Sequence, residues 1–82
     1  MMSNYQNLVK YIVDHLVTDP DQVLITSEMN DRGIVMVLIK VAPEDVGRVI
    51  GKRGATINAI RLVVKAAAVK ENERVEVDIV AD

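Results

Sequence analysis

The sequence contains no cysteine, phenylalanine or tryptophan, and it has only one histidine. Without cysteine, the chain cannot form a disulfide, a thiolate zinc site or a cysteine nucleophile, and this composition is compatible with a reducing environment. His15 has no second metal ligand at a suitable spacing and no nucleophile nearby in the sequence, so we interpret it as a surface or boundary residue. The sequence therefore indicates neither an enzyme nor a metal site, and no cofactor or small-molecule substrate is expected.

Long apolar runs and targeting signals are also absent. No stretch approaches the length of a membrane-spanning helix, and the N-terminus lacks a basic segment followed by an apolar run and a cleavage site. We therefore expect a cytoplasmic protein that makes no membrane contact. With 82 residues, half of them hydrophobic, the chain can build one modest core, and we expect a single domain over residues 1–82.

Aromatic residues are scarce. The two that occur, Tyr5 and Tyr11, both fall in the first predicted helix. RRM and OB-fold proteins hold nucleotide bases by stacking them on aromatic side chains. A nucleic-acid binder of that kind is therefore poorly supported.

Charge is distributed unevenly along the chain. The net charge is −2, but residues 48–70 carry six cations and no acid, which leaves a net charge of −8 on the rest. A phosphate chain responds to this local field rather than to the overall balance. We interpret Lys65 and Lys70 as residues that keep a helix surface soluble, whereas the other four cations lie in or near a glycine-containing stretch.

The hydrophobic pattern predicts six elements in the order α-β-β-α-α-β. They are a helix over residues 4–18, strands over 22–29 and 34–41, a short helix opened by Pro43, a long helix over 55–71 and a strand over 74–81. The second strand is apolar on both faces, which is typical of the centre of a sheet. Two helices separate it from the last strand, so a parallel crossover is available. We expect an α+β fold with a mixed three-stranded sheet and all three helices on one face.

The stretch Gly51-Lys52-Arg53-Gly54 separates the two C-terminal helices. We expect Gly51 to end the first of these helices in a left-handed conformation, and Gly54 to allow a close backbone approach. Two cations, bare amides from the glycines and the start of a new helix together form a phosphate cradle. The spacing does not fit a P-loop. A P-loop needs four residues between its first glycine and the Gly-Lys pair, and a serine or threonine directly after the lysine.

A helix-GxxG-helix segment flanked by Ile50 and Ile57 resembles the signature of KH domains, and the predicted element order resembles their type II arrangement. The resemblance covers the whole chain. It implies a non-enzymatic protein that clamps about four nucleotides of single-stranded RNA. The RNA-binding residues implied are Arg48, Val49, Ile50, Gly51, Lys52, Arg53, Gly54, Ile57 and Arg61. We expect the bound strand to lie in a groove with the glycine loop on one side. The loop around Glu73 and Arg74 is expected to form the opposite wall of this groove.

The long helix also has a second apolar row, made of Ala59, Leu62, Ala66 and Val69. We call this row the seam. It is either covered by the first helix or exposed for self-association, and the sequence leaves both open. If it is exposed, an alternative function is a protein-interaction module of KH fold.

The chain is similar in length and motif to the KhpA family of small, stand-alone bacterial KH proteins. This resemblance implies an RNA chaperone linked to cell-wall growth and cell length. It also implies pairing with itself as a homodimer, or with a larger KH protein of the Jag/KhpB type as a heterodimer. A third interpretation, ligand binding or catalysis by the glycine loop, is the weakest.

Overall fold

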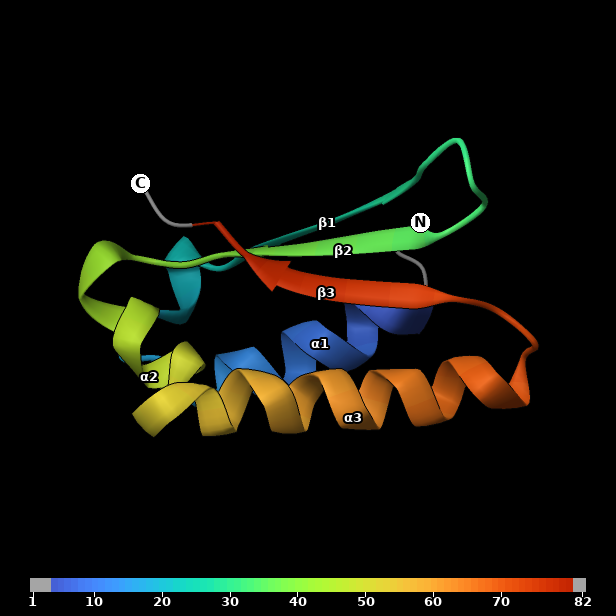
Figure 1. The fold of residues 1–82 in the computed structure, drawn as a ribbon. Helices are drawn as coiled ribbons and strands as arrows, with labels where there is room; N and C mark the ends of the chain where they lie inside the picture. Colours follow the sequence, from blue (N-terminus) through green and yellow to red (C-terminus); the bar gives the residue numbers. More distant parts are fainter. Residues whose placement is uncertain (1–3, 81–82) are drawn as a thin grey trace.

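A computed structural model describes residues 4–80 of the chain (Figure 1). In order, the elements are α1 (Asn4–Asp14), the 3₁₀ turn η1 (Pro20–Gln22), β1 (Leu24–Met29), β2 (Val35–Lys40), η2 (Pro43–Asp45), α2 (Val46–Ile50), η3 (Lys52–Gly54), α3 (Ala55–Lys70) and β3 (Val75–Ile79). The predicted α+β fold class and its α-β-β-α-α-β order are confirmed, with three short 3₁₀ turns added.

The sheet has β2 at its centre, as predicted. β1 pairs with β2 in antiparallel register, with Ile25 opposite Ile39, and β3 pairs in parallel, with Val77 opposite Val37. The connection from β2 to β3 runs through α2 and α3, which gives the chain the length that a parallel crossover needs. All three helices lie on one side of the sheet (Figure 1).

The core lies between the sheet and the two longer helices. Alternate residues of β2 face inward, and α1 and α3 each contribute one row of apolar side chains. The largest side chains that are fully buried in this core are Val9, Val13, Val37, Ile39, Val49 and Val64. On the other face of β2, Met36 and Leu38 are only half-buried.

Both edges of the sheet carry a side chain from a neighbouring helix. Gln6 of α1 donates from Nε2 to the carbonyl oxygen of Ile25 at 3.1 Å, and Arg61 of α3 donates from Nε to that of Val77 at 2.9 Å. An unpaired strand edge invites pairing with another chain, and a side chain bonded to it reduces that tendency. Arg61 therefore links α3 to the outer edge of β3.

The first helix ends earlier than predicted, at Asp14 rather than at residue 18. The backbone N–H groups of His15 and Leu16 bond to carbonyls three residues earlier, which tightens the last turn. Those of Thr18 and Asp19 donate to the Asp45 carboxylate instead of continuing the helix. The last strand is also shorter than predicted, and Ala81, where the prediction ended, lies outside the described residues.

Replacing Val64 and Val69 of α3 separately by alanine tests where the core lies. Val64 is fully buried and Val69 is 77% exposed, so the two changes alter helix propensity equally but differ in burial. We expect Val64→Ala to lower the free energy of unfolding by about 2 kcal/mol, because it leaves a cavity. Val69→Ala should change it by no more than about 0.5 kcal/mol. Urea unfolding followed by circular dichroism measures both, and equal losses would contradict this core.

Candidate nucleic-acid interface

Gly51 stands where α2 ends, and its backbone is not the left-handed helical conformation that we expected. Its φ is 76° but its ψ is 174°. A Cβ added here would lie 2.8 Å from the backbone nitrogen of Thr56, with the Thr56 hydroxyl closer still. Real Cβ atoms do not approach backbone this closely, so Gly51 is the position of close approach between the loop and α3.

Gly54 has the conformation that we had assigned to Gly51. Its φ of 78° and ψ of 11° are left-handed, and an added Cβ would meet only side-chain atoms, Asn58 Nδ2 at 3.6 Å and Ile57 Cγ2 at 4.0 Å. The predicted roles of the two glycines are therefore wrong: the close approach occurs at Gly51 and the left-handed helical conformation at Gly54, the reverse of the prediction. Arg53 is also left-handed, with a φ of 57°. Two successive left-handed residues turn the chain sharply into α3.

The free amides of the loop do not belong to the glycines, and that expectation was wrong. The Gly51 N–H donates to the carbonyl oxygen of Gly47 at 2.9 Å, and the Gly54 N–H donates to that of Gly51 at 3.1 Å. Within residues 4–80, the N–H groups of Lys52 and Arg53 donate to no carbonyl. Successive free N–H groups in such a turn form a concave site for an anion.

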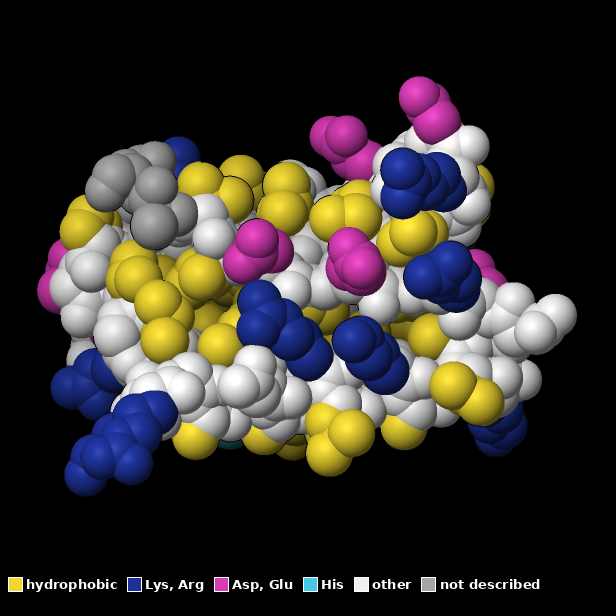
Figure 2. All heavy atoms as spheres, viewed as in Figure 1, with side chains coloured by type: hydrophobic (Ala, Val, Ile, Leu, Met, Phe, Trp, Pro, Cys, Tyr) yellow, Lys and Arg dark blue, Asp and Glu magenta, His cyan; other side chains and the backbone are white. Residues whose placement is uncertain are grey.

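The side chains of Lys52 and Arg53 are both exposed, so the free amides and the two positive charges occupy the same turn. This turn leads directly into the first residue of α3, a helix of 16 residues whose N-terminal end carries partial positive charge. In Figure 2, dark-blue side chains project at the end of the molecule where α2 meets α3. Three sources of positive potential therefore coincide at this loop.

The aliphatic residues that flank the loop divide into two groups. Val49 is fully buried and Ile57 is nearly so, and they therefore support the loop from inside the core. Ile50 is half-buried, as are Val46 and Ile79 nearby in the fold. Figure 2 shows hydrophobic side chains gathered between this end of the helical layer and the sheet. An apolar surface thus borders the cationic turn.

The two outer arginines of the predicted set differ in how they are bound. Arg48 is largely exposed, and its Nε lies 3.6 Å from the Asp45 carboxylate. Arg61 is half-buried and is held by three acceptors: the Val77 carbonyl, the Asn58 side chain at 2.9 Å and the Asp78 carboxylate at 3.5 Å. Arg61 therefore joins α3 to β3, and Asp78 balances part of its charge.

The expected second wall of the groove is in a different place. The loop containing Glu73 and Arg74 lies at the C-terminal end of α3, far from the glycine loop at its N-terminal end (Figure 1). β3 runs back from that loop toward α2, so the C-terminal end of β3 faces the cationic turn (Figure 1). Of β3, it is thus the C-terminal end near Ile79, and not the loop before the strand, that lies toward the turn (Figure 1).

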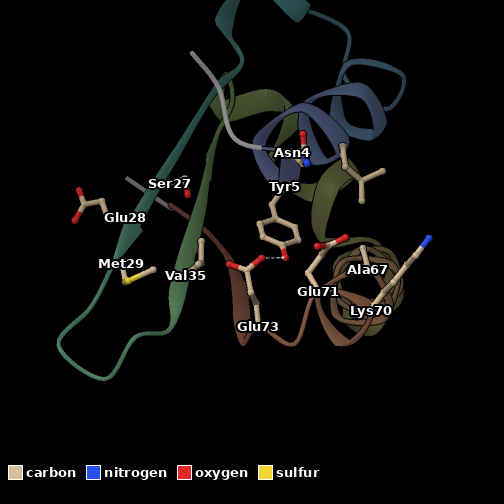
Figure 3. A pocket seen from close by; sticks show the side chains of 11 residues that line it. Asn4, Tyr5, Ser27, Glu28, Met29, Val35, Ala67, Lys70, Glu71 and Glu73 are labelled. Carbon is tan, nitrogen blue, oxygen red and sulfur yellow. Dashed lines mark hydrogen bonds between the residues drawn. The ribbon is translucent and has the colours of Figure 1, made fainter.

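A large hollow of the described chain lies at the other end of the molecule and does not suit a phosphate. It is an open cleft of about 470 Å³, and its lining has three acids, Glu28, Glu71 and Glu73, against one cation, Lys70 (Figure 3). The Tyr5 hydroxyl donates to Glu73 Oε1 at 2.6 Å. This bond, with burial and the charges of Glu73 and Glu71, raises the pKa of Tyr5 to about 12. The cleft is therefore a site of negative potential.

The seam is exposed. Leu62 is 72% exposed, Val69 is 77% exposed, and Ala59 and Ala66 also face solvent. Coverage by α1, one of the two alternatives, is therefore wrong. Val63 is exposed as well, and the analysis of the sequence missed it because it lies outside the row of the seam.

Two negative findings concern residues 4–80. None of the helices described is both long and apolar enough to cross a membrane. No group of three or more histidine, cysteine, aspartate or glutamate side chains in the described chain is arranged to hold a metal ion.

The fold and the helix-GxxG-helix loop define a KH domain, and comparison with known proteins specifies which kind. Residues 6–79 match the family described as KhpA/KhpB, KH domain, and the chain belongs to this family. It is 49% identical to the RNA-binding protein KhpA of Clostridium acetobutylicum over 92% of this chain and 99% of the relative. The proteins of the same name from Clostridium perfringens and Listeria monocytogenes are 47% and 39% identical, each over 92% of this chain and 99% and 97% of their own lengths. The family is not enzymatic.

Alanine substitutions of Gly51 and Gly47 test the loop geometry. Gly47 lies in α2 with open space around its Cα, whereas Gly51 combines a positive φ with the contact to Thr56. We expect Gly51→Ala to lower the free energy of unfolding by more than about 1 kcal/mol. Gly47→Ala should raise it by up to about 1 kcal/mol, because alanine favours helix. Thermal unfolding of both variants measures the difference, and a tolerated Gly51→Ala would contradict the close approach.

Proposed function

We propose that this protein binds single-stranded RNA through the Gly51–Gly54 loop, without catalysing a reaction. The observation that carries the proposal is the pair of free N–H groups at Lys52 and Arg53, in an exposed cationic turn at the start of α3. A phosphodiester oxygen would accept these N–H groups while the two side chains neutralise its charge. The relatives that are named RNA-binding proteins support RNA as the ligand.

The neighbouring surfaces support a strand of about four nucleotides. Phosphates would follow the cationic turn toward Arg48, and bases would lie over the apolar surface beside Ile50. The backbone groups of alternate β3 residues, including Ile79, point to the open edge, because Val80 N–H bonds to Ile39 on the β2 side. Base edges would therefore meet Arg61 and the end of β3. Contacts of this kind suit unpaired RNA rather than a closed duplex.

Replacing Lys52 and Arg53 together by aspartate should abolish most of the RNA affinity. The reversal places two negative charges beside the phosphates and removes two contacts, so we expect binding at least about 100-fold weaker. The slope of log affinity against log salt should also fall by about 1.4, since each phosphate contact on a single strand contributes about 0.7. Fluorescence anisotropy with a short unstructured RNA, measured at several salt concentrations, gives both values.

The matched control is the double variant in which Lys65 and Lys70 become aspartate. It makes the same change in net charge, but on α3 at positions away from the loop. It should keep most of the affinity, and circular dichroism should show all three proteins folded. Equal losses in the two double variants, or binding that does not depend on salt, would exclude the loop as the phosphate site.

The exposed seam supports a second proposal, that the protein forms a homodimer or a heterodimer with a larger KhpB-type KH protein. Two large side chains, Leu62 and Val69, project from it, and the small residues Ala59 and Ala66 would allow a close helix contact. Pairing would join two weak RNA clamps into one binder of higher avidity. The resemblance to KhpA extends this proposal to an RNA chaperone in the cytoplasm with a role in cell-wall growth and cell length.

Substituting Leu62 by glutamate tests the homodimer. A charge at the centre of an apolar contact would be desolvated without a partner, so the variant should be a monomer at concentrations where the original chain is a dimer. Met29→Glu is the matched control, because Met29 is 67% exposed but lies on β1, outside the seam. Sedimentation equilibrium gives the masses, and a monomeric original chain would refute the homodimer.

A further inference from the structure

Asp45 is the one charged side chain that is fully buried among residues 4–80, and it lies immediately before α2. Burial of an unpaired carboxylate is costly, so its surroundings must satisfy it. The groups that bond to Asp45 come from a segment that is distant in sequence.

The Asp45 carboxylate accepts three hydrogen bonds from the connector between α1 and β1. Its Oδ1 accepts the Thr18 N–H at 3.0 Å and the Thr18 hydroxyl at 2.9 Å, and its Oδ2 accepts the Asp19 N–H at 3.1 Å. The Thr18 N–H bond is the main reason that the pKa of Asp45 lies below its usual range, although burial opposes it. The ionised carboxylate therefore ties the start of α2 to the end of the α1 region.

α2 depends on such a tie. It has only five residues, which is far too few for a helix to be stable alone, and Val49 is its one buried residue. Its N-terminal end is fixed at Asp45, and its C-terminal end passes directly into Gly51. The orientation of α2 sets where the free N–H groups of Lys52 and Arg53 point.

We infer that Asp45 is a positioning residue for RNA binding: its contacts with Thr18 and Asp19 hold α2, and through α2 the Gly51–Gly54 loop, in the phosphate-accepting geometry. This inference rests on the proposed function. It differs from a purely electrostatic role, because Asp45 lies close to Arg48 and a carboxylate there would by its charge alone disfavour RNA. Removing the charge of Asp45 should weaken RNA binding if Asp45 positions the loop, and should strengthen it if Asp45 acts only by electrostatic repulsion.

The variant Asp45→Asn separates these roles. Asparagine has the same shape, but its NH₂ group must face one of the backbone N–H donors of the connector, so at least one bond is lost and two donors oppose each other. We expect the variant to remain folded and to bind a short unstructured RNA about tenfold more weakly. Tighter binding would overturn the inference in favour of an electrostatic role.

Hydrogen exchange distinguishes positioning from general stability, and it needs no RNA. In Asp45→Asn, the Gly51 N–H, which bonds to Gly47, and the N–H of Ile50 should exchange at least about tenfold faster, while that of Val37 in the central strand should change little. Equal acceleration at all three would show that Asp45 acts only through global stability. Unchanged exchange in α2 would also overturn the inference.

Two further variants calibrate the result. Glu44→Gln removes the neighbouring exposed carboxylate and should leave both RNA binding and exchange unchanged. Thr18→Val removes only the hydroxyl bond, keeps both backbone donors, and should give an intermediate effect. If the original chain binds RNA but Asp45→Asn binds equally well, the inference fails and the proposed function stands. If the Lys52 and Arg53 variant also binds equally well, the loop itself is not the site.

Discussion

The close contact between Gly51 and Thr56 is the constraint on which the rest of the candidate site depends. It brings the end of α2 against the first turn of α3, so that only four residues connect the two helices. A connection this short leaves no room for the amides of Lys52 and Arg53 to find internal carbonyls. The same steric limit that requires glycine therefore also produces the free donors that a phosphate oxygen can accept.

The sequence predicted the fold well because the signals involved are local. The apolar run of β2, the row of apolar residues on α3 and the GxxG spacing all lie within short windows, and each indicates its element directly. The details of the loop were predicted less well. Whether Gly51 or Gly54 makes the close approach depends on the position of Thr56 in space, and which amides stay free depends on Gly47. Asp45 was missed for the same reason, since its partner Thr18 is 27 residues away in the sequence.

Charge separation along α3 explains how a protein with a net negative charge can attract a phosphate chain at one end. Lys52 and Arg53 lie without an adjacent acid at the N-terminal end of this helix, where its dipole is positive, whereas Glu71 and Glu73 beyond its C-terminal end offset Lys70 and Arg74. The bond from Tyr5 to Glu73 holds part of that negative charge in place. The proposed RNA site is therefore the small loop, because a phosphate chain would be repelled from the large cleft, and cleft size is a poor guide to such a site.

The two surfaces that carry the proposed functions share α3 but use different parts of it. Inward residues such as Val64 bind the helix to the sheet, and Leu62 and Val69 face outward along its length. The proposed phosphate site lies only at its N-terminal end. A partner on the outer face would therefore leave the loop accessible, and a dimer through α3 would present two loops at a separation fixed by rigid helices. This arrangement favours a ligand with two single-stranded segments over one short segment, because the second contact then forms within an existing complex.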